Sequence, residues 1–97
     1  MPLRFEWDEA KEALNRRKHR VSFEEAKTVF YDEHALLLED PEHSETEDRF
    51  VLLGVSSSLR TLVVCHCYRS KPGVILLFSA RKATRVERAT YNRRWNP

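Results

Sequence analysis

The sequence predicts one α+β domain, with helices near both ends of the chain and an antiparallel sheet between them. The chain has 97 residues, 41% of them hydrophobic, which suits one ordered domain and argues against disorder. Apolar and polar residues alternate in several short segments, as in strands, and two Ser/Thr-x-x-Glu pairs mark helix starts. Four-residue links join the later strands, and links this short require antiparallel neighbours. We assign residues 1–97 to a single domain of this class.

The N-terminal segment predicts a short strand followed by a helix. Leu3, Phe5 and Trp7 alternate with polar residues, which is typical of a strand. Asp8 suits a helix N-cap, and the basic residues before Arg20 suit the C-terminal end of the same helix. Its predicted buried stripe has the spacing i, i+3, i+4, i+7 and consists of Ala10, Ala13, Leu14 and Arg17.

A second helix is predicted from a capping box formed by Ser22 and Glu25. Its predicted buried side consists of Phe23, Ala26, Val29 and Phe30. A short strand over 35–38 follows, and then an acidic loop over 40–45 that is rich in turn-forming residues.

The second half of the chain predicts the rest of the sheet and a last helix. Its strands are expected at 49–56, 61–69 and 74–81. The middle strand is apolar on both alternations, so we expect it to be central and covered on both faces. Thr84 and Glu87 form a second capping box, which opens a helix that runs to about Arg94.

Composition excludes a membrane-spanning helix. The longest apolar run, Val74–Phe78, has five residues, far fewer than a bilayer requires. The N-terminus has no apolar segment typical of a secretory signal. We therefore expect a cytoplasmic protein that does not bind membranes.

Charge is divided unevenly along the chain. Residues 1–48 hold seven Lys and Arg against fourteen Asp and Glu, a net charge of −7. Residues 49–97 hold ten Lys and Arg against one Glu, a net charge of +9. Either the basic half binds a polyanion, or the two halves neutralise each other across the folded surface.

Cys65-His66-Cys67 is the pattern closest to a metal site. Strand alternation places both cysteines on one face and His66 on the other, and zinc needs three or four converging ligands. We therefore predict no metal and no cofactor, and we expect both cysteines to be small buried hydrophobes without a disulfide. His66 is a candidate for proton transfer near neutral pH, the alternative being a half-buried histidine with a structural role.

Basic residues gather at strand ends and in the last helix, and arginine outnumbers lysine eight to two, which suits recognition of phosphate. The set is Arg49, Arg60, Arg69, Lys71, Arg81, Lys82, Arg85, Arg88, Arg93 and Arg94. Tyr68, Tyr91 and Trp95 lie between them and can stack on unpaired bases. The alternative is a solvated face that contacts an acidic partner.

Five motifs are spread along the chain: Phe5-Glu6-Trp7-Asp8, Arg17-Lys18-His19-Arg20-Val21-Ser22-Phe23-Glu24-Glu25-Ala26, Asp40-Pro41-Glu42-His43-Ser44, Glu47-Asp48-Arg49-Phe50 and Ser79-Ala80-Arg81-Lys82-Ala83-Thr84. Over residues 5–92 these motifs resemble those of the BrnT toxins. One departure is Arg20, where the family commonly has glycine, so the turn after the first helix is expected either to strain this arginine or to be built differently.

The resemblance implies a toxin of a bacterial type II toxin–antitoxin system with a RelE-like ribonuclease fold. That fold has a short N-terminal strand, two helices, an antiparallel sheet of about four strands and a C-terminal helix. Such toxins cleave RNA and inhibit translation until a cognate antitoxin binds them. The antitoxin expected here is similar to BrnA, a ribbon-helix-helix protein, so any contact with DNA is indirect.

RNA cleavage without a metal needs a proton acceptor for the 2′-OH, cations at the phosphate and a proton donor for the leaving oxygen. The predicted catalytic residues are His66, Arg69, Arg81, Lys82 and Tyr91, and the predicted RNA-binding residues are Arg49, Arg60, Arg85 and Arg88. In this hypothesis Arg69, Arg81 and Lys82 bind the phosphate. His66 is the general acid or base, and Tyr91 stacks on a base or joins the proton transfer.

Two points of this hypothesis stay open. Alternation places Arg81 and Lys82 on opposite faces unless their strand ends between them, so one of the two is expected to lie outside the site. RelE-like sites often work without histidine, which leaves a structural role for His66. The competing function is a non-catalytic module that binds RNA or an acidic partner through the basic half.

Overall fold

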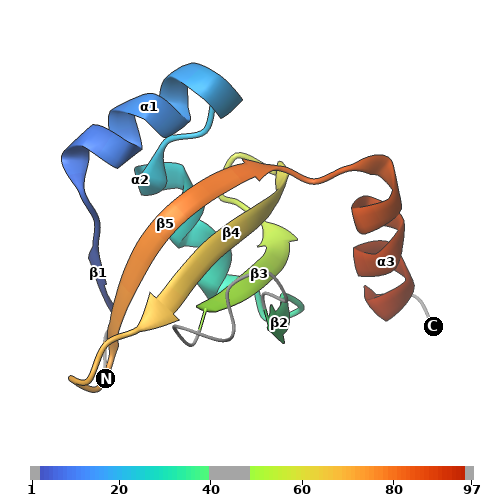
Figure 1. The fold of residues 1–97 in the computed structure, drawn as a ribbon. Helices are drawn as coiled ribbons and strands as arrows, with labels where there is room; N and C mark the ends of the chain where they lie inside the picture. Colours follow the sequence, from blue (N-terminus) through green and yellow to red (C-terminus); the bar gives the residue numbers. More distant parts are fainter. Residues whose placement is uncertain (1–2, 40–48, 96–97) are drawn as a thin grey trace.

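Five strands and three α-helices, with one 3-10 helix, make up the computed structural model, which describes residues 3–39 and 49–95 (Figure 1). Along the chain they are β1 (Arg4–Glu6), α1 (Glu9–His19), α2 (Phe23–Ala26), the 3-10 helix η1 (Lys27–Tyr31), β2 (Leu36–Glu39), β3 (Arg49–Val55), β4 (Thr61–Tyr68), β5 (Val74–Lys82) and α3 (Arg85–Trp95). The predicted element order is confirmed, and the predicted loop over 40–45 lies outside the described residues.

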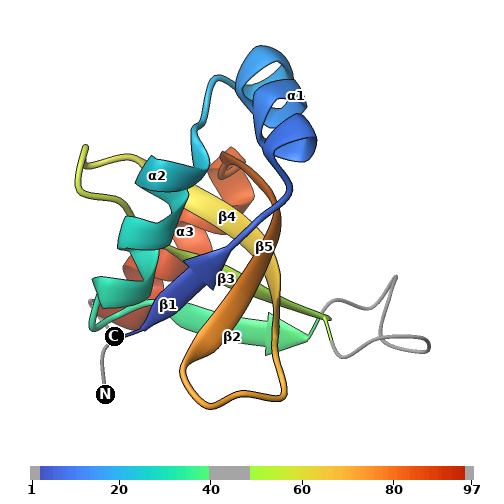
Figure 2. The same ribbon diagram turned by 90° about the vertical axis from the view of Figure 1, so that its left-hand side faces the viewer.

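The strands form one sheet in the order β1-β5-β4-β3-β2. β2 to β5 are antiparallel neighbours, as predicted, but β1 pairs in parallel with β5 through Arg4–Val74 and Glu6–Leu76 (Figure 2). The predicted antiparallel sheet of about four strands is therefore a mixed sheet of five. The helices and strands between β1 and β5 leave enough chain for a parallel return, which a short hairpin link does not allow.

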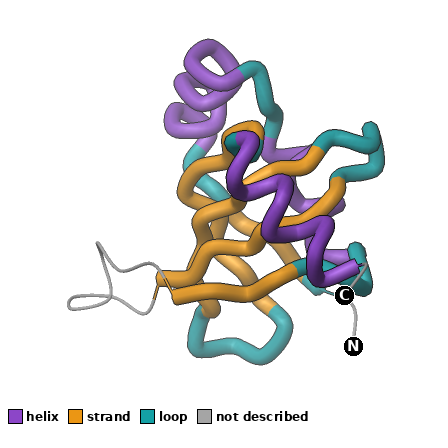
Figure 3. The backbone as a smooth tube through the Cα atoms, turned by 90° about the vertical axis from the view of Figure 1, so that its right-hand side faces the viewer, coloured by secondary structure: helices purple, strands orange, loops and turns teal. Residues whose placement is uncertain are grey.

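The two faces of the sheet are covered differently. Val21, α2 and η1 cover one face, which we call the helical face, and their apolar side chains form the main core there. Its buried members are Val21, Phe23, Ala26, Val29, Leu52, Leu62, Val64, Ile75, Leu77 and Ala80. α3 crosses part of the opposite face, where Tyr91 and Ala83 pack with Leu53 and Val63 (Figure 3). β4 is the central strand, as predicted.

The sequence predicts the wrong buried side of α1. Leu14 is 60% exposed, whereas Glu12 and Asn15 are buried. The two polar side chains are buried because each satisfies backbone groups of neighbouring segments. Glu12 accepts the backbone N–H of Phe23 at 3.3 Å, and Asn15 bonds to β5. Hydrogen bonding, not apolar spacing, therefore determines which side of α1 faces the protein.

Asn15 joins α1 to the outer edge of β5. Its side-chain oxygen accepts the backbone N–H of Ala80 at 3.0 Å, and its amide nitrogen donates to the Ala80 carbonyl at 2.8 Å. The same amide nitrogen donates to the carbonyl of Val21 at 2.9 Å. Because β1 pairs with β5 only as far as Leu76, the Asn15 carboxamide takes the place of a further strand at Ala80.

α1 ends at Arg20, which adopts the left-handed conformation with φ 59° and ψ 33°. Its N–H donates to the carbonyl of Arg16 at 2.9 Å. The turn therefore keeps the geometry in which glycine is the ordinary residue, at a cost of about 1 kcal/mol for a side chain with a Cβ. The alternative, a turn built differently, is wrong.

A β-bulge at Phe78 changes the alternation of β5. Cys65 pairs with Ser79 and His66 with Leu77, so Phe78 is an extra residue with no partner of its own in the ladder. Beyond the bulge, Ala80 returns to the helical face, and Arg81 therefore points to the opposite face. Without the extra residue, Arg81 would point to the helical face.

Replacing Asn15 by alanine is expected to destabilise the fold by about 2–4 kcal/mol, because buried groups of Ala80 and Val21 lose their partner. Urea unfolding followed by circular dichroism measures the change. Asn92→Ala is the matched control, since Asn92 is exposed on α3. A loss for Asn15→Ala no larger than that of the control would contradict the bridging role.

Candidate functional site

Within residues 3–39 and 49–95, no segment covers the part of the sheet that lies between α1 and α3. In Figure 1, β4 and β5 face the viewer there, and no helix crosses in front of them. We call this surface the open face. Apart from the residues packed against α3, the register and the bulge place seven side chains on it: Arg49, Cys65, Cys67, Leu76, Phe78, Ser79 and Arg81. Ser79 is exposed, and the other six are half-buried.

Arg49 extends across the sheet from β3 to Phe78 on β5. Its guanidinium carbon lies 4.1 Å from the centre of the Phe78 ring, and Lys11 Nζ of α1 lies 5.5 Å from the same centre. Stacking of a guanidinium on an aromatic ring is favourable because the ring face is electronegative. Two cations from separate elements therefore meet over one aromatic ring.

Arg81 is held at the opposite end of the open face by Glu87 of α3. Its two terminal nitrogens donate to the two carboxylate oxygens of Glu87 at 2.7 and 2.9 Å. Because Arg81 lies in the row of Val63 and Arg49 in the row of Cys67, the two arginines are separated by about 13 Å along the strands. The open face thus has a fixed cation at each end.

Glu87 also closes the predicted capping box of α3. Its Oε1 accepts the backbone N–H of Thr84 at 2.8 Å, and the Thr84 hydroxyl accepts the N–H of Glu87 at 3.1 Å. The hydrogen bonds from Arg81 lower the pKa of Glu87 to about 2, and the same contact raises the pKa of Arg81. This arginine is therefore charged whenever the protein is folded near neutral pH.

Tyr91 belongs to α3, and its side chain is buried between this helix and the sheet. Its hydroxyl donates to Asp32 Oδ2 at 2.7 Å, an oxygen that also accepts the N–H of Val55 at 2.9 Å. Burial opposes ionisation of Asp32, but the hydrogen bonds from Val55, Tyr91 and His34 together lower its pKa. Gly54 allows this approach, since a Cβ there would lie 2.9 Å from Val29 and Ala35 side-chain atoms and 3.0 Å from Asp32.

His66 lies on the helical face, as alternation predicts, and is fully buried. The Phe30 ring meets it at a centroid distance of 4.7 Å, and Phe50 and Tyr68 also contact it. Its Nδ1 lies 3.1 Å from the carbonyl of Val64, and its Nε2 lies 3.3 Å from the hydroxyl of Tyr68. Burial lowers the pKa of His66, which favours the neutral ring.

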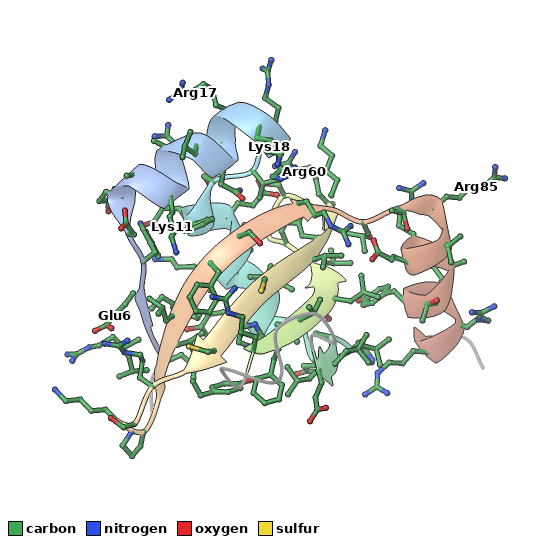
Figure 4. The ribbon with its side chains drawn as sticks, viewed as in Figure 1. Glu6, Lys11, Arg17, Lys18, Arg60 and Arg85 are labelled. Atoms are coloured by element: carbon green, nitrogen blue, oxygen red, sulfur yellow. The ribbon has the colours of Figure 1, made fainter. Side chains whose placement is uncertain are left out.

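Of the remaining predicted site residues, Lys82 and Arg60 lie away from the open face, and Arg69 lies at its edge, beside Glu6. Lys82 is exposed on the helical side, so Arg81 and Lys82 are separated, as strand alternation predicts. Arg69 lies beyond the end of β4, where its Nε is 3.6 Å from Glu6. Arg60 lies near the C-terminal end of α1, where it bonds to Glu25 and to the carbonyl of Arg20 (Figure 4).

Two predicted RNA-binding residues lie on α3. Arg85 is exposed at the start of the helix, and in Figure 4 its side chain points away from the sheet. Arg88 is exposed and donates to the carbonyl of Ala83 at 3.0 Å. They border the open face without lying on it.

Of the nine predicted site residues, the structure brings Arg49 and Arg81 onto one open surface. Sequence reasoning missed Phe78 and Lys11, because the bulge and the position of α1 leave no mark in the residue pattern. Cys65 and Cys67 share a face, as predicted, but are half-buried and not part of the core. Among the described side chains, no three His, Cys, Asp or Glu residues gather where they could hold a metal ion.

The fold and family comparisons define the class of protein. The family model for BrnT, the ribonuclease toxin of type II toxin–antitoxin systems, matches residues 7–87. The crystal structure of the Brucella abortus ribonuclease toxin BrnT, at 1.1 Å, has a similar fold, with a TM-score of 0.65 and 20% sequence identity. The match covers 86% of this chain and 99% of that one, and no curated protein matches the chain.

A ribonuclease toxin of a type II toxin–antitoxin system is the class that this family model describes. Since the matched region spans most of the sequence, the chain belongs to the BrnT family, and the resemblance seen in its motifs is confirmed. Within the described residues, no helix is both long and apolar enough to cross a membrane.

Burial of a neutral His66 makes stability depend on pH. The pKa of His66 is lower in the folded protein than its ordinary value of 6.5, so the unfolded chain binds the proton first. The free energy of unfolding is therefore expected to fall as the pH decreases from 7.5 to 5. His66→Gln should flatten this slope in urea unfolding relative to wild type. Equal slopes for wild type and His66→Gln would contradict the effect of burial.

Proposed function

We propose that this chain is an endoribonuclease toxin that binds and cleaves RNA on its open face. The observation that carries the proposal is the placement of Arg49 and Arg81 on one uncovered surface of the sheet. Membership of a ribonuclease toxin family supports an RNA substrate. The fixed cations suit a polyanion, because arginine binds phosphate with planar, charge-assisted hydrogen bonds.

Arg81 is the group we assign to the scissile phosphate. Attack of the ribose 2′-oxygen on phosphorus forms a pentavalent phosphate with one more negative charge, and the bond to the 5′-oxygen then breaks. The 2′-hydroxyl proton leaves to solvent, and the 5′-oxygen gains one. Glu87 holds the Arg81 guanidinium before substrate arrives, so little reorganisation is needed when this charge develops.

Arg49 and Lys11 position the RNA strand beside this phosphate. They lie over Phe78, toward the other end of the open face from Arg81. Charge fixed in the fold at both ends of the face provides the stabilisation, so the proposed cleavage needs no metal ion. Cleavage of RNA in the cytoplasm would inhibit translation.

Proton transfer is assigned to water at the open face and not to His66. The imidazole lies on the helical face, enclosed by Phe30 and Phe50, and burial keeps it neutral. Tyr91 is likewise assigned the role of fixing α3 through Asp32. Lys82 is assigned to the surface outside the site, and Arg69 to the edge of the open face, where it pairs with Glu6.

The partner proposed for this toxin is a BrnA-like ribbon-helix-helix antitoxin. Family membership implies an antitoxin, and the charged open face is the surface whose covering would block RNA. An acidic antitoxin segment that contacts Arg49 and Arg81 would serve this purpose.

Arg81→Gln is expected to lower RNA cleavage by about 10²–10³-fold, because it removes a fixed cation from the transition state. The measurement is gel-based cleavage of a labelled RNA by purified protein. Lys82→Gln is the matched control, since it removes the same charge one residue away on the other face, and it should stay within about threefold of wild type. Equal losses in the two variants would contradict a site on the open face. RNA binding by wild type without cleavage would instead support the non-catalytic module.

Removal of metal ions is expected to leave cleavage unchanged, because the proposed stabilising charges belong to Arg49 and Arg81. Activity after dialysis against EDTA, compared with activity after addition of Mg²⁺, measures this. Loss of cleavage in EDTA with recovery on addition of metal would show that the proposed charge stabilisation is incomplete.

A further inference from the structure

Phe78 is set apart from the other aromatic side chains by the bulge in β5. Most described aromatic residues lie on the helical face or against it, where several form one contiguous group with His66. The Tyr91 side chain is buried between α3 and the sheet. Among the aromatic side chains that the structure describes, Phe78 is the one on the open face.

The surroundings of the Phe78 ring are cationic. Arg49 comes from β3 and Lys11 from α1, and both reach the ring, at 4.1 and 5.5 Å from its centre. Because the Arg49 guanidinium lies over the ring, an incoming base stacks on this guanidinium or takes its place on the ring, and both cations stay close to the phosphates on either side of the base. Sites for single-stranded nucleic acid combine these features, because bases stack on aromatic rings while cations follow the backbone.

Arg81 lies three residues further along β5, about 10 Å from Phe78. A nucleotide next to a base stacked at Phe78 therefore lies within reach of the Arg81 side chain. The ring and the cation assigned to the scissile phosphate are close enough to act on one RNA strand.

We propose that Phe78, Arg49 and Lys11 form a stacking subsite that takes one unpaired base and restricts the enzyme to single-stranded RNA. This inference rests on the proposed function. In a duplex both faces of each base are already stacked, so a base must first be unstacked at a cost in free energy. An unpaired base joins the Phe78–Arg49 stack without that cost.

The test is a binding measurement with RNA that cannot be cut. Fluorescence anisotropy compares a labelled 2′-O-methyl RNA strand with the same strand in a duplex, at one fixed salt concentration. Phe78→Leu keeps an apolar side chain and removes the ring. It is expected to weaken single-strand binding about tenfold and leave duplex binding unchanged. Phe78→Tyr keeps the ring and should bind like wild type, as should Tyr31→Leu, which removes an exposed ring from η1.

The outcomes separate this inference from the function on which it rests. If wild type cleaves RNA but Phe78→Leu binds single strands as well as wild type, the stacking subsite is wrong and the proposed function stands. If wild type neither binds nor cleaves RNA, both are wrong. If Phe78→Leu loses affinity for a purified antitoxin while RNA binding is unchanged, the ring belongs to a protein interface and the inference is overturned.

Discussion

The carboxamide of Asn15 is the interaction on which the arrangement of the open face depends. It occupies the backbone N–H and carbonyl of Ala80 at the edge of β5, beyond the point where β1 stops pairing. The bulge lies two residues before Ala80, and it determines that Phe78 and Arg81 share a face. Asn15 therefore links the position of α1 to the geometry of the strand that carries both side chains.

The acidic and basic halves of the chain use their charges in two ways. Some charges neutralise each other inside the fold, as Glu25 does with Arg60, an interaction that lowers the pKa of Glu25. Glu87 belongs to the basic half, and it orients Arg81 without removing the arginine from the open face. Neutralisation across the fold therefore accounts for part of the charge, and Arg81 stays on the open face while paired with Glu87.

Local signals in the sequence predict the elements well. The capping box of Thr84 and Glu87 forms in full. At the other predicted box, Ser22 accepts the N–H of Glu25 as predicted, but the Glu25 carboxylate bonds to Ser56 and Arg60. The short links also give the antiparallel order correctly, since chain length alone determines it. These features depend on residues close together in sequence, so the sequence contains the information needed.

The site was harder to predict because it depends on long-range geometry. A single extra residue in β5 moves Arg81 to the open face, and no local pattern marks which residue is extra. The buried side of α1 was mispredicted for a similar reason. The buried Asn15 is polar, and its partner Ala80 lies 65 residues away in the sequence. Periodicity arguments assume that burial follows apolarity, and they fail where a buried amide replaces a strand.

The pairing of β1 with β5 has a consequence for how the protein is made. Arg4 pairs with Val74, and Asn15 bonds with Ala80, so β1 and α1 find their partners in β5, which is translated long after them. The hairpins β3–β4 and β4–β5 join neighbours in sequence and can form sooner, because closing a short loop costs less entropy. Because Phe78 and Arg81 both lie on β5, the open face forms only after β5 has left the ribosome and paired with β4.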